Sequence, residues 1–91
     1  MPNMNGNLGG NIVSKIAAKV ARLHSDASIV ARSLPQAAIP QNTIKFYREI
    51  LTEAREDDQI AATLRGFPDV TEQTQYRDFL VMVGQLLVIL S

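Results

Sequence analysis

The sequence contains no cysteine and no tryptophan, and it has a single histidine, His24. Without cysteine, the chain cannot form disulfides, cysteine-ligated zinc sites or a thiol nucleophile. With one histidine, it cannot build a metal site from several histidines or a catalytic histidine pair. Aromatic residues are also scarce, at 5% of 91 residues. These absences remove most of the side chains on which small metal sites and nucleophilic enzymes depend.

An excess of either charge is lacking too, because nine Lys and Arg residues balance nine Asp and Glu residues. Proteins that bind nucleic acid gain most of their affinity from basic side chains that neutralise phosphates, so the neutral charge of this chain argues against a nucleic-acid partner. The first residues, MPNMNGNLGG, contain neither the basic nor the apolar region of a secretory signal. We therefore expect a cytoplasmic protein without a membrane span.

The residues that are present have the balance of an ordinary globular protein, with 46% hydrophobic and 20% charged residues. This length suits one small domain, whose core is marginal because such a chain buries roughly 60–65% of its extended surface. Residues 1–10 have no apolar period that could offset the entropy of ordering them. We expect a flexible Asn/Gly-rich lead over residues 1–10 and a single helical-bundle domain over residues 11–91.

The hydrophobic spacing after Gly10 predicts an all-α fold, a compact bundle of five or six short helices. Apolar residues recur at three- and four-residue steps in five segments, which are separated by prolines, a glycine and acidic residues. Pro35 and the run Gly66-Phe67-Pro68 are typical of helix ends. Only residues 85–90 would also suit a strand. The residues expected to cap the helix starts are Asn11, Ser25 or Asp26, Asn42 or Thr43, Asp57 and Asp69.

The C-terminal segment is the most hydrophobic part of the chain, because ten of the thirteen residues from Phe79 to Ser91 are large and apolar. A surface helix needs one apolar stripe, and this segment is apolar nearly all round. It is either the central helix of the core, or a surface that contacts a second copy or another protein, or the remnant of a contact in a longer chain. The candidate apolar interaction residues are Phe79, Val83, Leu86, Leu87 and Leu90.

The neutral total conceals a separation of charge along the chain. Residues 1–48 hold six basic residues and one acidic residue, a net +5, whereas residues 49–91 hold three basic and eight acidic residues, a net −5. The two halves either fold onto each other and cancel, or they orient the molecule toward a charged partner. The candidate charged interaction residues are Lys15, Lys19, Arg22, Glu53, Glu56, Asp57 and Asp58.

Catalysis, cofactors and metal ions are not expected. His24 lies at the end of a predicted helix, where a cation is favourable, and this structural role explains it better than catalysis does. The sequence has no phosphate-binding glycine loop, nucleophile elbow or metal-ligand spacing. Residues 59–77 resemble a helix-turn-helix, with Gln73, Gln75 and Arg77 of the types that read bases. However, the turn is long and the region is acidic, which disfavours this arrangement.

No motif is specific enough to name a family. Short helices with proline-punctuated connectors are shared by death-fold-like adaptors and small dimeric regulatory bundles, but architecture does not give function. The leading hypothesis is a non-enzymatic protein–protein interaction module, a small regulator or adaptor that forms a homodimer through its C-terminal apolar helix. The alternatives are a helix-turn-helix nucleic-acid-binding protein and a structural subunit of a larger assembly.

Overall fold

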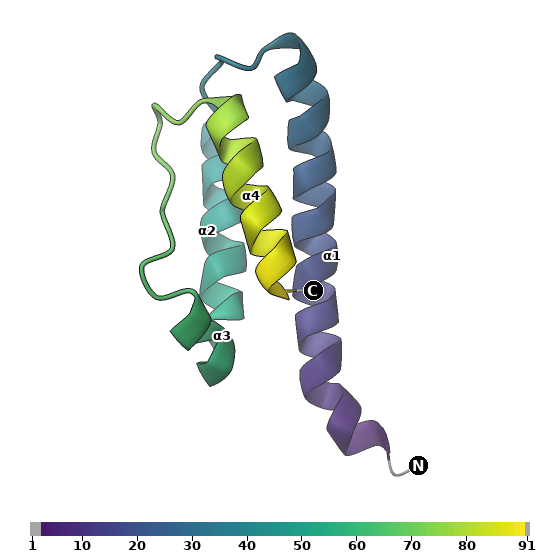
Figure 1. The fold of residues 1–91 in the computed structure, drawn as a ribbon. Helices are drawn as coiled ribbons and strands as arrows, with labels where there is room; N and C mark the ends of the chain where they lie inside the picture. Colours follow the sequence, from purple (N-terminus) through teal and green to yellow (C-terminus); the bar gives the residue numbers. More distant parts are fainter. Residues whose placement is uncertain (1–2, 91) are drawn as a thin grey trace.

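The computed structural model describes the backbone of residues 3–90 and the side chains of residues 13–90. This part of the chain contains four helices and no strand, apart from an isolated bridge between Ala38 and Gln75. The all-α prediction is confirmed, whereas the expected number of five or six helices is wrong. The helices are α1 (Asn3–Ser33), α2 (Gln41–Ala54), α3 (Asp58–Thr63) and α4 (Tyr76–Leu90), as shown in Figure 1.

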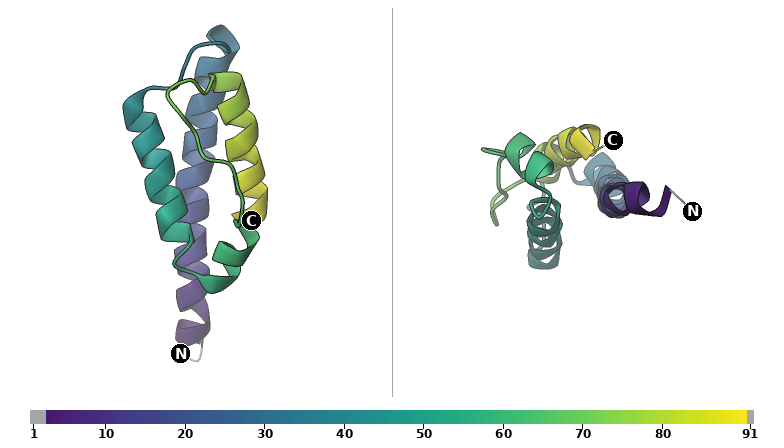
Figure 2. Two further views of the ribbon diagram at one scale, coloured as in Figure 1. Left: turned by 90° about the vertical axis from the view of Figure 1, so that its left-hand side faces the viewer. Right: turned by 90° about the horizontal axis from the view of Figure 1, so that it is seen from below.

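The long helix α1 sets the shape of the molecule. Its 31 residues span about 46 Å at 1.5 Å per residue, close to the 49 Å longest dimension of the fold. Helices α2 and α4 both run in the opposite direction to α1, and the first turns of α1 extend past their ends (Figure 1). Seen along the bundle, α1, α2 and α4 lie at the corners of a triangle (Figure 2).

The first two predicted helices are one helix, because α1 continues through the expected break at Ser25 and Asp26. Neither residue is a proline or glycine, and extending an existing helix is far easier than nucleating a new one. Burial of an uninterrupted apolar stripe stabilises the continuous form. The helix ends at Ser33, just before Pro35, as the sequence predicted. The buried residues of α1, three or four positions apart, are Ile16, Val20, Leu23 and Ala27.

The start of α1 also differs from the prediction. The helix begins at Asn3 and passes through Asn11, so the expected cap at Asn11 is wrong. Residues 3–10, expected to form an irregular lead, have a helical backbone because propagation from the stable part of α1 needs no new nucleus. Met1, Pro2 and Ser91 lie outside the described residues. The flexibility expected for the lead stays a prediction.

Helix α2 begins at Gln41, slightly earlier than expected. Pro40 occupies the N-cap position and makes no side-chain hydrogen bond there. The Pro40 carbonyl accepts hydrogen bonds from the backbone N–H groups of Thr43 (3.0 Å) and Ile44 (3.1 Å). The predicted caps Asn42 and Thr43 therefore lie inside the first turn. Proline is well suited to this boundary, since its fixed φ and missing N–H cost nothing there.

Helix α3 has the local signals that the sequence predicted. The Asp57 carboxylate accepts hydrogen bonds from the backbone N–H groups of Gln59 (2.9 Å) and Ile60 (3.1 Å), which confirms it as the N-cap. After the helix, Gly66 has a φ of 77°, in the left-handed region that favours glycine. The turn is closed by the Phe67 N–H, which donates to the Leu64 carbonyl at 2.9 Å.

The predicted helix start at Asp69 is wrong, because α4 begins only at Tyr76. The Asp69 carboxylate instead accepts hydrogen bonds from the Val70 N–H (2.8 Å) and from Arg48 Nε (3.2 Å) on α2. These two donors lower the pKa of Asp69. Arg48 also donates to the Val70 carbonyl at 2.8 Å, and the Val70 side chain is fully buried. The connection 64–75 is thus fastened to α2 rather than wound into a helix.

A buried aromatic pair joins α2, α4 and this connection. The rings of Tyr47 and Phe79 meet edge to face, with centroids 5.5 Å apart and planes at 70°, and both residues are fully buried. The Tyr47 hydroxyl donates a hydrogen bond to the Pro68 carbonyl at 3.1 Å. Burial raises the pKa of Tyr47 from 10.0 to about 12, because the ionised phenolate would lose its hydration.

The raised pKa of Tyr47 predicts a loss of stability at high pH. The phenol of Tyr47 has a pKa near 10 in the unfolded chain and about 12 in the folded protein, so the unfolded chain loses this proton first as pH rises. The free energy of unfolding therefore falls as pH rises from 10 to 12. Tyr47→Phe removes this pH dependence of the free energy of unfolding, and it also removes a hydrogen bond that stabilises the fold by about 1 kcal/mol. In urea denaturation at pH 9, 10 and 11, the advantage of wild type over Tyr47→Phe should shrink as pH rises. An advantage that stays constant would contradict this account.

Gly84 on α4 lies against His24 of α1. His24 lies within this long helix and not at a helix end, where it was expected from the sequence. A Cβ atom placed on Gly84 would lie 3.5 Å from His24 Nε2, an ordinary van der Waals distance. Helix continuation past Ser25 explains the different place of His24. The site therefore has room for a methyl group.

Replacing the two described glycines outside the first turns of α1 should have opposite effects. Gly84→Ala should raise the free energy of unfolding by about 0.5–1 kcal/mol, because alanine favours the helix and the site has room. Gly66→Ala should lower it by about 1 kcal/mol, because the backbone there has a φ of 77° although nothing lies nearby. Urea denaturation followed by circular dichroism measures both, and a destabilising Gly84→Ala would contradict the room for a methyl group beside His24.

Candidate functional site

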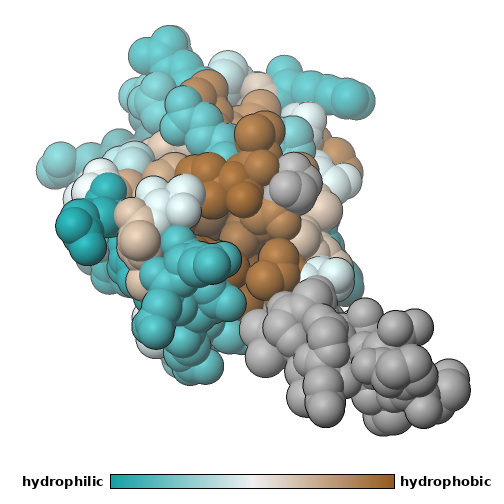
Figure 3. Space-filling model, turned by 60° about the horizontal axis from the view of Figure 1, so that its bottom comes forward, coloured by the Kyte–Doolittle hydropathy of each residue, from teal (hydrophilic) through white to brown (hydrophobic). Residues whose placement is uncertain are grey.

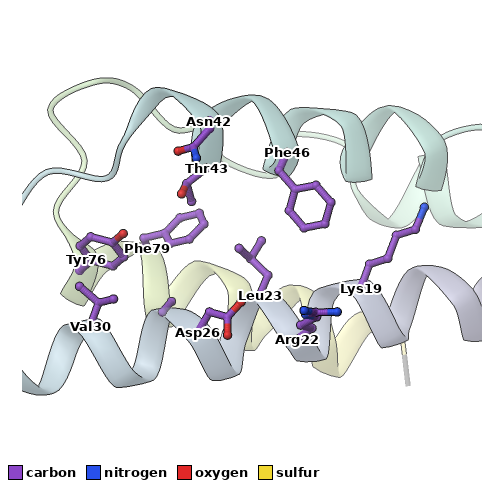
Figure 4. Close-up of a pocket in the computed structure, with 11 residues that line it drawn as sticks. Lys19, Arg22, Leu23, Asp26, Val30, Asn42, Thr43, Phe46, Tyr76 and Phe79 are labelled. Atoms are coloured by element: carbon purple, nitrogen blue, oxygen red, sulfur yellow. The ribbon is translucent and has the colours of Figure 1, made fainter.

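An open groove of about 430 Å³ lies between α1 and α2. The two helices form its walls and run in opposite directions, while the first turn of α4 contributes Tyr76 and Phe79 to its floor (Figure 4). The groove exists because α4 packs closely against α1 and leaves one side of the α1–α2 pair uncovered. Its lining combines side chains from three helices, α1, α2 and α4.

The floor of the groove is apolar. Leu23 and Ala27 of α1 are buried there beside Phe79. Phe46 of α2 points across toward Leu23 (Figure 4), and 39% of its surface is still exposed. Phe46 lies beside the core-facing stripe of α2, which includes the neighbouring Tyr47, so it reaches the groove and not the core. The floor can therefore bury an apolar side chain from another molecule.

One end of the groove is closed by an ion pair. Lys19 Nζ on α1 lies 2.9 Å from Glu53 Oε2 on α2, and both side chains are partly exposed. In Figure 4, Lys19 reaches toward α2 at the end of the groove farthest from Tyr76. This pair bridges the two walls and sets the length of the opening.

Farther along the α1 edge, Arg22 and Asp26 line the groove one helical turn apart. Their side chains carry opposite charges, yet within the described part of the chain neither forms a hydrogen bond or ion pair with any residue, including the other. Figure 4 places both on the rim of the opening. They are thus free to pair with charged groups of a bound molecule.

The apolar residues that the sequence proposed for interaction lie mainly in the core of the single chain. Leu87 is partly buried against that core. Helix α1 covers this side of α4 because it is one long helix and not two short ones, so a single chain has enough layers to enclose the stripe. The fully or almost fully buried members of the set are Phe79, Val83, Leu86 and Leu90.

The proposed charged residues are distributed over several places. Lys15, Lys19 and Arg22 are exposed along α1, Asp57 caps α3, and Glu56 and Asp58 are exposed beside it. Lys19–Glu53 and Arg48–Asp69 are the ion pairs among the described residues, and each joins the basic half of the sequence to the acidic half. At these two points the halves fold onto each other and their charges cancel.

Most residues of the groove were not identified as site residues from the sequence, among them Phe46 and Asp26. Asp26 was expected to cap a helix. The spacing of Lys15, Lys19, Arg22 and Asp26 would have revealed Asp26, because these positions share one face of a continuous helix. Phe46 could not be separated from the core stripe of α2 by sequence, because Tyr47 and Ile50 beside it belong to that stripe.

A second apolar area lies at the end of the bundle where α4 ends (Figure 3). Helix α3 and the last turns of α4 reach this end, and their Ile60, Leu87 and Ile89 are only partly buried. Hydrophilic residues border this area in Figure 3.

No helix in the described part of the chain is both long enough and apolar enough to cross a membrane. Among the same residues, no three His, Asp or Glu side chains are grouped so that they could hold a metal ion. In comparisons with known proteins, no family model, no curated protein and no solved structure matches the chain. The function must therefore be argued from the groove itself.

The Lys19–Glu53 ion pair should contribute little to the free energy of unfolding, because both side chains are partly exposed to solvent. A double-mutant cycle with Lys19→Ala and Glu53→Ala should give a coupling energy of about 0.2–1 kcal/mol that decreases as salt is added. The matched control, Lys15→Ala combined with Glu53→Ala, should be additive. A coupling energy near zero at low salt would show that the pair does not hold the two walls together in solution.

Proposed function

We propose that the chain is a non-enzymatic protein–protein interaction module, a small regulator or adaptor, that binds its partner in the groove between α1 and α2. The observation that carries this proposal is the combination of an apolar floor with charged side chains that have no partner in the described chain. Protein interfaces share this arrangement, an apolar centre surrounded by a polar rim. Phe46 is of the residue class that often anchors such a contact.

The shape of the groove favours a helix as the bound segment. Its walls are two helices, and an amphipathic helix commonly binds by placing its apolar face into such a groove. With α1, α2 and α4 at the corners of a triangle, a further helix along α1 and α2 would extend the bundle by helix packing of the kind already present (Figure 2). The bound face would bury the exposed part of Phe46.

This proposal moves the interaction away from the C-terminal helix, because most of its stripe is buried within one chain. The helix-turn-helix alternative loses the observation on which it rested. Gln73 and Gln75 lie in the connection before α4 and not on a second helix. Nothing in the structure favours the structural-subunit alternative over a binding module.

The proposal can be tested by position-specific photo-crosslinking in the native cell. A benzoylphenylalanine at position 46 should form an adduct with another polypeptide, whereas the same probe in place of Val81, which is exposed on α4 away from the groove, should not. Thr43→Arg, which fills the groove with a bulky cation, should reduce the adduct at position 46 at least several-fold. Circular dichroism confirms that each variant is folded.

Two results would count against the proposal. One is the absence of any adduct at position 46, and the other is equal labelling at positions 46 and 81. An adduct that is unchanged by Thr43→Arg would likewise show that the contact does not use the groove. Mass spectrometry of the adduct identifies the partner, whether it is another protein or a second copy.

A further inference from the structure

We infer that the occupant of the groove is a second copy of the chain, packed across a two-fold axis so that Arg22 of each copy pairs with Asp26 of the other. The inference rests on the proposed function and names the partner. It starts from the two charged side chains on the α1 rim that have no partner within the described chain.

The spacing of these two charges suits a two-fold contact. Arg22 and Asp26 are four residues apart, so their positions differ by about 6 Å along the helix axis. When two copies of α1 lie antiparallel and the two-fold axis passes at the level of His24, each Arg22 faces the Asp26 of the other copy. A two-fold interface requires every contact to occur twice, and this arrangement forms two identical ion pairs.

The neighbouring charge does not oppose this arrangement. Lys19, the next cation on the same edge, is already paired with Glu53 of its own chain at 2.9 Å. A rim with charge of one sign would repel its own copy, whereas the pair Arg22 and Asp26 is complementary to itself. Charge complementarity thus points to this chain as its own partner.

Apolar side chains on the same face add contact area. Ile29 lies one turn beyond Asp26 on α1 and is 62% exposed. In the antiparallel arrangement it lies at the level of Lys19 of the other copy, whose alkyl stem can cover an apolar neighbour. The exposed part of Phe46 lies in the groove of each copy and becomes buried when the second α1 enters.

Sedimentation equilibrium of the full chain and its charge variants tests the inference. The wild type should dimerise, and Arg22→Asp or Asp26→Arg should each raise the dimer Kd by roughly tenfold or more, because both reciprocal pairs become like-charged. The double variant R22D/D26R should return the Kd to within about threefold of wild type, since the exchange restores both pairs.

Mixing the two single variants gives a second, independent measurement. Neither should dimerise well alone, but an equimolar mixture should form a heterodimer in which every pair is again opposite in charge. Arg65→Asp and Glu56→Arg change the net charge equally at exposed positions away from the groove and serve as the matched control. The dimer Kd of each control variant alone, and of the two mixed, should stay within about threefold of the wild-type value. The same threefold limit applies to the double variant R22D/D26R.

The outcomes separate this inference from the proposed function. A wild type that remains monomeric at millimolar concentration overturns the second copy as occupant, and crosslinking of position 46 to another protein would still support the binding groove. A dimer whose Kd is the same in R22D and D26R uses another face and also overturns the inference. Neutral variants, Arg22→Gln and Asp26→Asn, provide the same comparison if a reversed charge perturbs the fold.

Discussion

The packing of α4 against a single unbroken α1 is the constraint on which the rest of the structure depends. Phe79, Val83 and Leu86 are fully buried because the stripe of α1 continues without interruption from Ile16 to Ala27. A break in α1 would leave one side of α4 uncovered, and this chain is too small to have a spare helix for that purpose. The close α1–α4 contact also displaces α2 to one side and thereby opens the groove.

The groove therefore follows from how the core is closed, and its chemistry follows from which residues fall beside the core stripes. Phe46 is adjacent to Tyr47, which is fully buried, and Arg22 is adjacent to Leu23, which is buried. One step along a helix turns a side chain by about 100°, enough to move it from the core to the rim. The same helices thus supply the apolar floor and the charged edge.

Several features that depend on neighbouring residues were predicted from the sequence, and those that depend on distant residues were missed. Asp57 and Gly66 were identified correctly because a cap and a left-handed turn are settled within a few residues. Asp69 was assigned wrongly because its partner Arg48 lies 21 residues away and competes with helix capping. In the groove, Lys19 and Arg22 were recognised, whereas Asp26 required knowing that α1 continues, which tertiary burial decides.

The pairing of α1 with α4 joins the first and last helices of the described chain, and this has a consequence for synthesis on the ribosome. Until α4 has been made, the stripe of α1 lacks most of its cover, and the nascent chain exposes it to chaperones or to other nascent chains. Contacts between such distant segments also slow folding, because a long loop must close before they can form. The protein thus acquires this core only after α4 has been synthesised.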